Sequence, residues 1–249
     1  MSEEKRSFHA GLAVLGVALA VGMIVSAWLV SSTVRDVKLA NQTIVVKGYA
    51  QKEVKSDIVV WNGRFTSRDP DLVAAYSKLE KDLKVVLEYL SRSGIPREDI
   101  AVSAVTTTIQ NRKTSQGYDT NEIEQYVLEQ TVSVRSGNVE LVSNLSRDST
   151  TLIRDGIEFF SYPPEYYYSK IEDMKIQLLG EATQNARLRA EQLAINSGGK
   201  VGSLRAATQG VFQITPLYST DVDDWGRYDT TTIEKAVKAV VTIQYSIGQ

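Results

Sequence analysis

The sequence contains no cysteine and one histidine, His9. Disulfides, thiolate nucleophiles and cysteine metal sites are therefore excluded, and so are multi-histidine zinc sites. His9 lies at the cytoplasmic edge of a hydrophobic segment, so we expect no histidine-dependent catalytic triad in the folded region. An excess of one charge is also absent, because 28 Lys and Arg residues stand against 30 Asp and Glu residues. A nucleic-acid binder needs a basic stripe to replace phosphate counterions. The basic residues here are scattered, so we expect no nucleic-acid partner.

Charge is also missing from one long N-terminal stretch, residues 10–34. About 20 apolar residues cross a hydrocarbon core of about 30 Å. Lys5 and Arg6 precede the stretch, so the positive-inside rule places residues 1–9 in the cytoplasm. Trp28 lies near the outer end, where an indole suits the membrane interface. The sequence predicts a single-pass anchor over 10–34, a tether over 35–42, and an extracytoplasmic domain over 43–249.

A cleaved signal peptide is the main alternative for this segment. Val25-Ser26-Ala27 fits the small-residue cleavage rule, with cleavage after Ala27. Trp28-Leu29-Val30 continues the apolar run beyond that point and favours the anchor. A buried soluble helix is a third reading. The first two readings both place the domain outside the cytoplasm, in the periplasm if two membranes are present.

The remaining residues alternate between strand and helix patterns. Ala182, Ala186, Ala190 and Ala194 recur every four residues and give one helix a smooth face for close packing. Asp69-Pro70 is typical of a helix start, Ser93-Gly94 of a helix end, and Asn138 of an N-cap. Strands are expected at 43–50, 57–67, 100–110, 123–135, 156–161, 202–214 and 231–247, and helices after Pro70, after Asn138 and at 169–196.

This order predicts an α+β fold in which antiparallel sheets are packed by two long helices and one shorter helix. An internal duplication is one interpretation, since Tyr118-Asp119-Thr120 followed by Ile123-Glu124 recurs as Tyr228-Asp229-Thr230 followed by Ile233-Glu234. The inner faces of the two strands differ by one residue under that alignment. A β-bulge absorbs such a slip, and coincidence explains the repeat equally well.

Aromatic residues supply the candidate interaction site. Tyrosines give a large contact area at low entropic cost and are enriched in interfaces. The candidates for packing or self-association are Tyr162, Tyr166, Tyr167, Tyr168 and Trp225. A small-ligand platform is the weaker alternative for the tyrosine segment.

Asp221, Asp223 and Asp224 lie beside Trp225 in an acidic loop. Carboxylates bind Ca²⁺ in flexible loops, but this spacing lacks the glycine turn and closing glutamate of an EF-hand. We therefore interpret the segment as a solvated loop. No paired carboxylates, phosphate loop or Ser–Lys arrangement is recognisable, so we expect no enzyme, no cofactor and no metal.

Several segments together resemble the SIMPL-domain family, the YggE-like envelope proteins. The opening segment reads Val46-Lys47-Gly48-Tyr49-Ala50, then Val54-Lys55-Ser56-Asp57, although family members more often have Gly in place of Ala50 and Pro in place of Ser56. The run from Leu90 to Ile100, LSRSGIPREDI, is more characteristic. The alanine-rich helix and the Gly199-Lys200-Val201-Gly202 turn complete a likeness over residues 42–248.

The resemblance implies an α+β fold, an envelope location and a tendency toward large homo-oligomers. It carries no catalytic residues, and it links the family loosely to the envelope and to oxidative stress. We therefore expect a membrane-anchored, non-catalytic envelope protein that acts through assembly, as an oligomeric scaffold or a stress-protective protein. The alternative is a monomeric extracytoplasmic module that binds a peptide, a lipid or a small molecule.

Overall fold

The structure is a computed structural model that describes residues 16, 19–32, 42–221 and 223–248. The chain divides into two compact units. The described residues of unit 1 are 16, 19–32, 42–50, 177–211 and 239–248, and unit 2 comprises 51–176 and 212–238 without residue 222. Three long elements contribute residues to both units: β1 (Thr43–Lys55), α4 (Ile171–Asn196) and β11 (Glu234–Gly248).

Unit 2 is built on a six-stranded antiparallel sheet. The order is β3-β5-β2-β6, β4 also pairs with β5, and β7 also pairs with β2. The long central pair runs from Val59 opposite Ser136 to Asp69 opposite Tyr126. The strands are β2 (Ile58–Asp69), β3 (Ile100–Val102), β4 (Thr106–Lys113), β5 (Asp119–Ser136), β6 (Glu158–Ser161) and β7 (Glu165–Tyr167).

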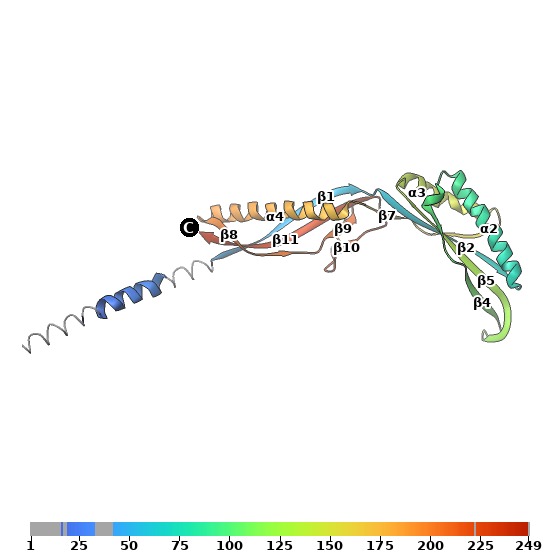
Figure 1. Cartoon of the computed structure of the whole chain (residues 1–249), viewed down its shortest axis with the longest axis horizontal. Coiled ribbons are helices and arrows are strands. Elements are labelled where there is room, and N and C mark those ends of the chain that lie inside the picture. The colour runs from blue at the N-terminus through green and yellow to red at the C-terminus, as the bar shows by residue number, and fades with distance from the viewer. Residues whose placement is uncertain (1–15, 17–18, 33–41, 222, 249) are drawn as a thin grey trace, which may run out of the picture. The chain divides into compact units, whose positions relative to one another are not determined.

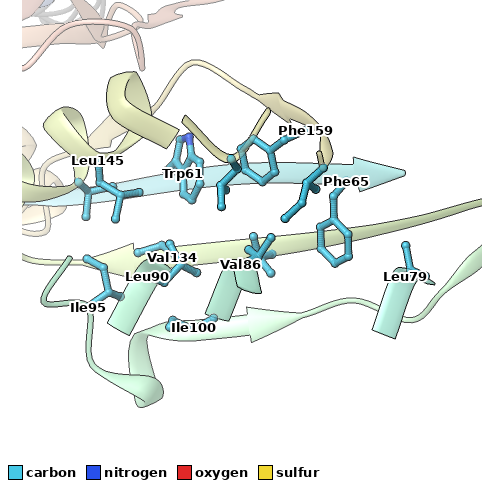
Figure 2. Packing of buried hydrophobic residues seen from close by; sticks show 14 of the residues in the cluster. Trp61, Phe65, Leu79, Val86, Leu90, Ile95, Ile100, Val134, Leu145 and Phe159 are labelled. Carbon is cyan, nitrogen blue, oxygen red and sulfur yellow. The ribbon is translucent and has the colours of Figure 1, made fainter. Parts of the chain in front are cut away.

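Two helices, α2 (Leu72–Arg92) and α3 (Val139–Asp148), cover one face of this sheet. Figure 2 shows Leu79, Val86 and Leu90 of α2 packed toward side chains of β2 and β5. Trp61 is fully buried, and its Nε1–H donates to Ser161 Oγ at 3.0 Å. The largest side chain of the core therefore has its polar atom satisfied as well.

Unit 1 contains a smaller sheet on which the helix α4 packs. In this unit β11 pairs with β8 (Lys200–Gln209), antiparallel, and with β1. Figure 1 shows α4 running along one face of these strands. In unit 2 the first residues of β11 pair with β9 (Gln213–Pro216), and β9 pairs in parallel with β10 (Arg227–Tyr228).

The α+β class with largely antiparallel sheets is confirmed, and most expected elements are present. Asn138 caps α3 through a bond from the Leu141 N–H to its Oδ1 at 3.1 Å. The predicted cap of α2 was wrong: Asp71 accepts the Ala74 N–H, whereas Asp69 accepts the Asp71 N–H. The expected strand 100–110 is interrupted after Val102. The internal duplication stays a prediction.

The predicted membrane segment 10–34 lies partly outside the described residues, as do Lys5, Arg6 and most of the tether 35–42. Residues 19–32 are helical, and Trp28 is exposed on that helix. Among the described residues, no helix has the length and apolar character needed to span a membrane. The anchor stays a prediction.

Candidate functional site: an uncovered sheet surface and a presented tryptophan

The position of α4 in unit 1 is set by an unusually close approach to β1. Ala182 and Ala186 are fully buried against Gly48. A Cβ at Gly48 would lie 2.0 Å from the Ala182 carbonyl oxygen and 2.7 Å from the Ala186 Cβ. Only glycine allows the two backbones to come this close. The alanine stripe predicted from the sequence therefore packs on β1, with Ala190 and Ala194 also buried.

The outer edge of β1 is also protected by this helix. Asn185 Oδ1 accepts the Tyr49 N–H at 3.2 Å, and Arg189 Nη1 donates to the Lys47 carbonyl at 3.2 Å. Polar side chains that occupy edge hydrogen-bonding groups keep further strands from adding there. In unit 1, β1 is thus closed by α4.

Within the described residues, the opposite strand, β8, lacks both features of β1: a helix packed over it and side chains bonded to its outer edge. Every residue of β8 except Val201 is exposed, and Leu204 is 57% exposed. One edge of β8 pairs with β11, and no described strand pairs with the other. A helix about 10 Å wide covers about two strands spaced about 4.8 Å apart. Since α4 lies over β1, it leaves β8 uncovered.

The result is an apolar groove of about 660 Å³ between α4 and β8, over β11. Leu204 and Ala207 of β8 lie opposite Tyr245 and Ile243 of β11, so these side chains share the face that α4 partly covers. We call this face of β8 and β11 the β8 shelf. The residues that line its groove include Leu179, Gly180, Arg187, Leu204, Ala207 and Ile243.

The predicted tyrosine site lies in unit 2, and its members are half-buried. Tyr166 packs against the core, and its hydroxyl lies 2.9 Å from that of Ser143. Tyr162 meets Phe160 edge to face at 4.7 Å. Tyr167 and Tyr168 line a cavity of about 470 Å³ with Arg135. Much of this aromatic area is therefore used for packing inside unit 2, and a role in an interface stays a prediction.

Tyr167 has an altered acidity. A hydrogen bond from its hydroxyl to Glu165 Oε2 at 2.5 Å, together with burial, raises the pKa of Tyr167 to about 12. We expect Glu165→Gln to return this pKa toward the ordinary value of about 10. Because the folded-state pKa is raised, the stabilisation is present below about pH 10 and is lost as the pH rises toward 12. Absorbance titration at alkaline pH, with Tyr167→Phe to assign the signal, measures the change; an identical titration of both chains would contradict it.

Trp225 stands out from the other candidates because its side chain is 93% exposed. In the acidic loop, Asp221 pairs with Arg227 at 2.8 Å, and Asp223 Oδ1 accepts the Trp225 N–H at 2.9 Å. Among the described residues, no three His, Asp or Glu side chains are grouped to hold a metal ion. The carboxylates of Asp221 and Asp223 thus shape the loop.

A buried ion pair in unit 2 went unnoticed in the sequence. Lys235 Nζ lies 3.1 Å from Asp229 Oδ2, and the two side chains are 1% and 6% exposed. Burial raises the pKa of the Asp229 carboxyl, but hydrogen bonds from Thr232, Thr231 and Lys235 outweigh it and hold that pKa well below its usual range. A sequence signal existed, because the alternation that points Val237 inward also points Lys235 inward.

These features define a class of two-unit α+β protein with an uncovered sheet surface and a presented tryptophan. The SIMPL family, described as a protein of unknown function (DUF541), matches residues 44–245. The chain therefore belongs to the SIMPL family, and the resemblance predicted from its motifs is confirmed.

Comparison with curated proteins finds no match. Among solved structures, the chain is similar to the de novo designed protein Foldit4, with 18% identity and a TM-score of 0.23 over 42% of this chain and 93% of that one. It is also similar to an uncharacterized conserved protein from Listeria innocua, with 8% identity and a TM-score of 0.19 over 77% of this chain and 91% of that one. Likeness at this level assigns no function.

Proposed function

We propose that this chain is a membrane-anchored, non-catalytic protein of the cell envelope that acts through protein–protein assembly. The observation that carries the proposal is the β8 shelf, an apolar sheet surface with an open edge in unit 1. Exposed edges and apolar patches invite association unless they are blocked. The chain blocks the edge of β1 with Asn185 and Arg189, while no strand in the described part of the chain pairs with the outer edge of β8.

Unit 2 supports this reading by contrast. Its sheet is covered by two helices, α2 and α3, whereas in unit 1 the helix α4 packs on β1. A sheet buries its apolar face against another layer. The missing cover over β8 is supplied, in this proposal, by a partner protein. The anchor over residues 10–34 fixes the site of assembly at the outer face of the membrane.

The mass of the full chain in detergent micelles, measured by light scattering, tests this proposal. We expect an assembly. We also expect Leu204→Glu to raise the dissociation constant of the assembly at least about tenfold, because association would bury the new carboxylate. Val73→Glu is the matched control, since Val73 is an exposed apolar residue of α2 in unit 2. A strictly monomeric wild-type chain would refute assembly.

A monomeric binding module is the second candidate function. The observation in its favour is the cavity of about 470 Å³ in unit 2, where Tyr167, Tyr168 and Tyr228 lie near Arg135. Aromatic rings beside one cation suit a planar or anionic small molecule. Thermal stabilisation by such a compound, abolished by Arg135→Ala, supports this function.

A further inference from the structure

Trp225 is displayed on a turn whose backbone is held on both sides. The Gly226 N–H donates to the Asp223 carbonyl at 3.1 Å, and Gly226 has a φ of +87°, which suits glycine. The Trp225 N–H is itself bound by Asp223 Oδ1. The base of the indole side chain is therefore fixed, while the ring lies in solvent.

The buried side chain of Gln213 also holds this turn through hydrogen bonds. Gln213 is 6% exposed, its Nε2 donates to the Asp223 carbonyl, and its Oε1 accepts the Arg227 N–H at 3.0 Å. A buried amide is thus used to hold a solvent-exposed turn. Pre-ordering a contact residue in this way lowers the entropic cost of binding. Tryptophan is among the residues that most often dominate interface energies.

We propose that Trp225 of one copy inserts into the α4/β8 groove of a second copy. This inference rests on the proposed assembly function and names the two surfaces that meet. The groove is apolar and open, and Leu179, Leu204 and Ala207 offer aliphatic contact to an indole. An indole that enters it loses the large solvent-exposed area that the free turn displays.

Charge supports the same pairing. Asp223 and Asp224 directly precede Trp225 on the turn, and Arg187, which pairs with Glu191 at 2.9 Å, lines the groove. The segments 42–50, 177–211 and 239–248 of unit 1 carry five basic residues against two acidic ones: Lys47, Arg187, Arg189, Lys200 and Arg205 against Glu181 and Glu191. An acidic turn approaching a basic surface gains both orientation and association rate.

Both surfaces belong to the same chain, which favours a second copy as the partner. The turn and the groove are different patches, so the contact is heterologous and each copy still offers one free turn and one free groove. Repeated contacts of this kind form a ring when the rotation between neighbouring copies adds up to a full turn, and a filament when it does not.

The absence of cysteine from the chain permits a clean crosslinking test. One full-length chain carries Asp224→Cys beside Trp225, and another carries Gly180→Cys, where a Cβ meets nothing within 4 Å. The two are mixed in micelles and oxidised. We expect a disulfide-linked dimer to form at least about tenfold faster than with Ser115→Cys, an exposed control, in place of Asp224→Cys. Ala207→Cys serves as a second groove position if Gly180→Cys lowers the melting temperature.

The particle mass from light scattering separates the outcomes. Assembled particles without crosslinking above the control overturn this inference and leave the assembly function standing. Monomers without crosslinking overturn both. A third chain carries both cysteines. If it forms only an intramolecular disulfide, even at high protein concentration, then the groove binds the turn of the same chain, and a second copy is not the occupant. Fast crosslinking that Trp225→Ala abolishes supports the proposal.

Discussion

Replacing Asp229 by alanine is expected to lower the free energy of unfolding by about 3–5 kcal/mol. The change leaves the Lys235 ammonium in a site where its side chain is 1% exposed, with the Thr232 carbonyl still accepting a hydrogen bond from it. It also removes the acceptor of the Thr231 N–H at 3.1 Å and of the Thr232 N–H at 3.2 Å. Urea unfolding followed by the fluorescence of buried Trp61, in the same unit, measures the loss.

The double variant Asp229→Ala with Lys235→Met is the control for this prediction. Because it removes the buried charge together with its partner, we expect it to recover much of the loss. Equal destabilisation of the single and double variants would show that the ion pair is not the cause. Asp229→Asn keeps the shape of the side chain and isolates the contribution of its charge.

The same pair predicts a pH dependence. Hydrogen bonds hold the folded-state pKa of Asp229 below the unfolded value of about 3.9. The stability that this carboxylate contributes is therefore present above about pH 4 and is lost as the pH falls through the folded-state pKa. The difference between wild type and Asp229→Asn is expected to narrow below about pH 4.

Gly48→Ala is expected to destabilise unit 1 by at least about 2–3 kcal/mol, because the new Cβ collides with the backbone of α4. The new Cβ would lie 2.0 Å from the Ala182 carbonyl oxygen, a backbone atom that cannot rotate away. Gly180→Ala is the matched control: its Cβ meets open space, and alanine favours a helix by about 1 kcal/mol over glycine. Hydrogen exchange of the α4 amides reports both effects, and equal protection in the two variants would contradict the close approach.

The sequence predicts the parts of the fold that depend on local patterns. The stripe of α2 and the four-residue alanine repeat of α4 are visible because helical periodicity repeats over many residues. The start of α2 was misplaced because Asp69 and Asp71 are both good caps, and the choice between them depends on the geometry of the loop. The short strand β7 was missed because three residues, Glu165–Tyr167, give no periodicity.

The candidate site was harder to predict, since it depends on contacts between distant segments. The residue type alone points to Trp225, but its presentation depends on Gln213, which lies in β9. Gly48 belongs to a family motif in the sequence, but its close approach to Ala182 depends on the folded structure. The exposure of β8 follows from the position of α4, which no local pattern encodes.

Hydrogen exchange of the β8 amides in the full chain tests assembly through the β8 shelf most directly. At a concentration where particles are assembled, cover over Lys200–Gln209 is expected to slow exchange, and dilution to monomers is expected to restore it. The β4–β5 turn around Ser115 serves as the internal reference. Fast exchange of β8 at every concentration, with the assembled mass unchanged, would contradict the role of the shelf.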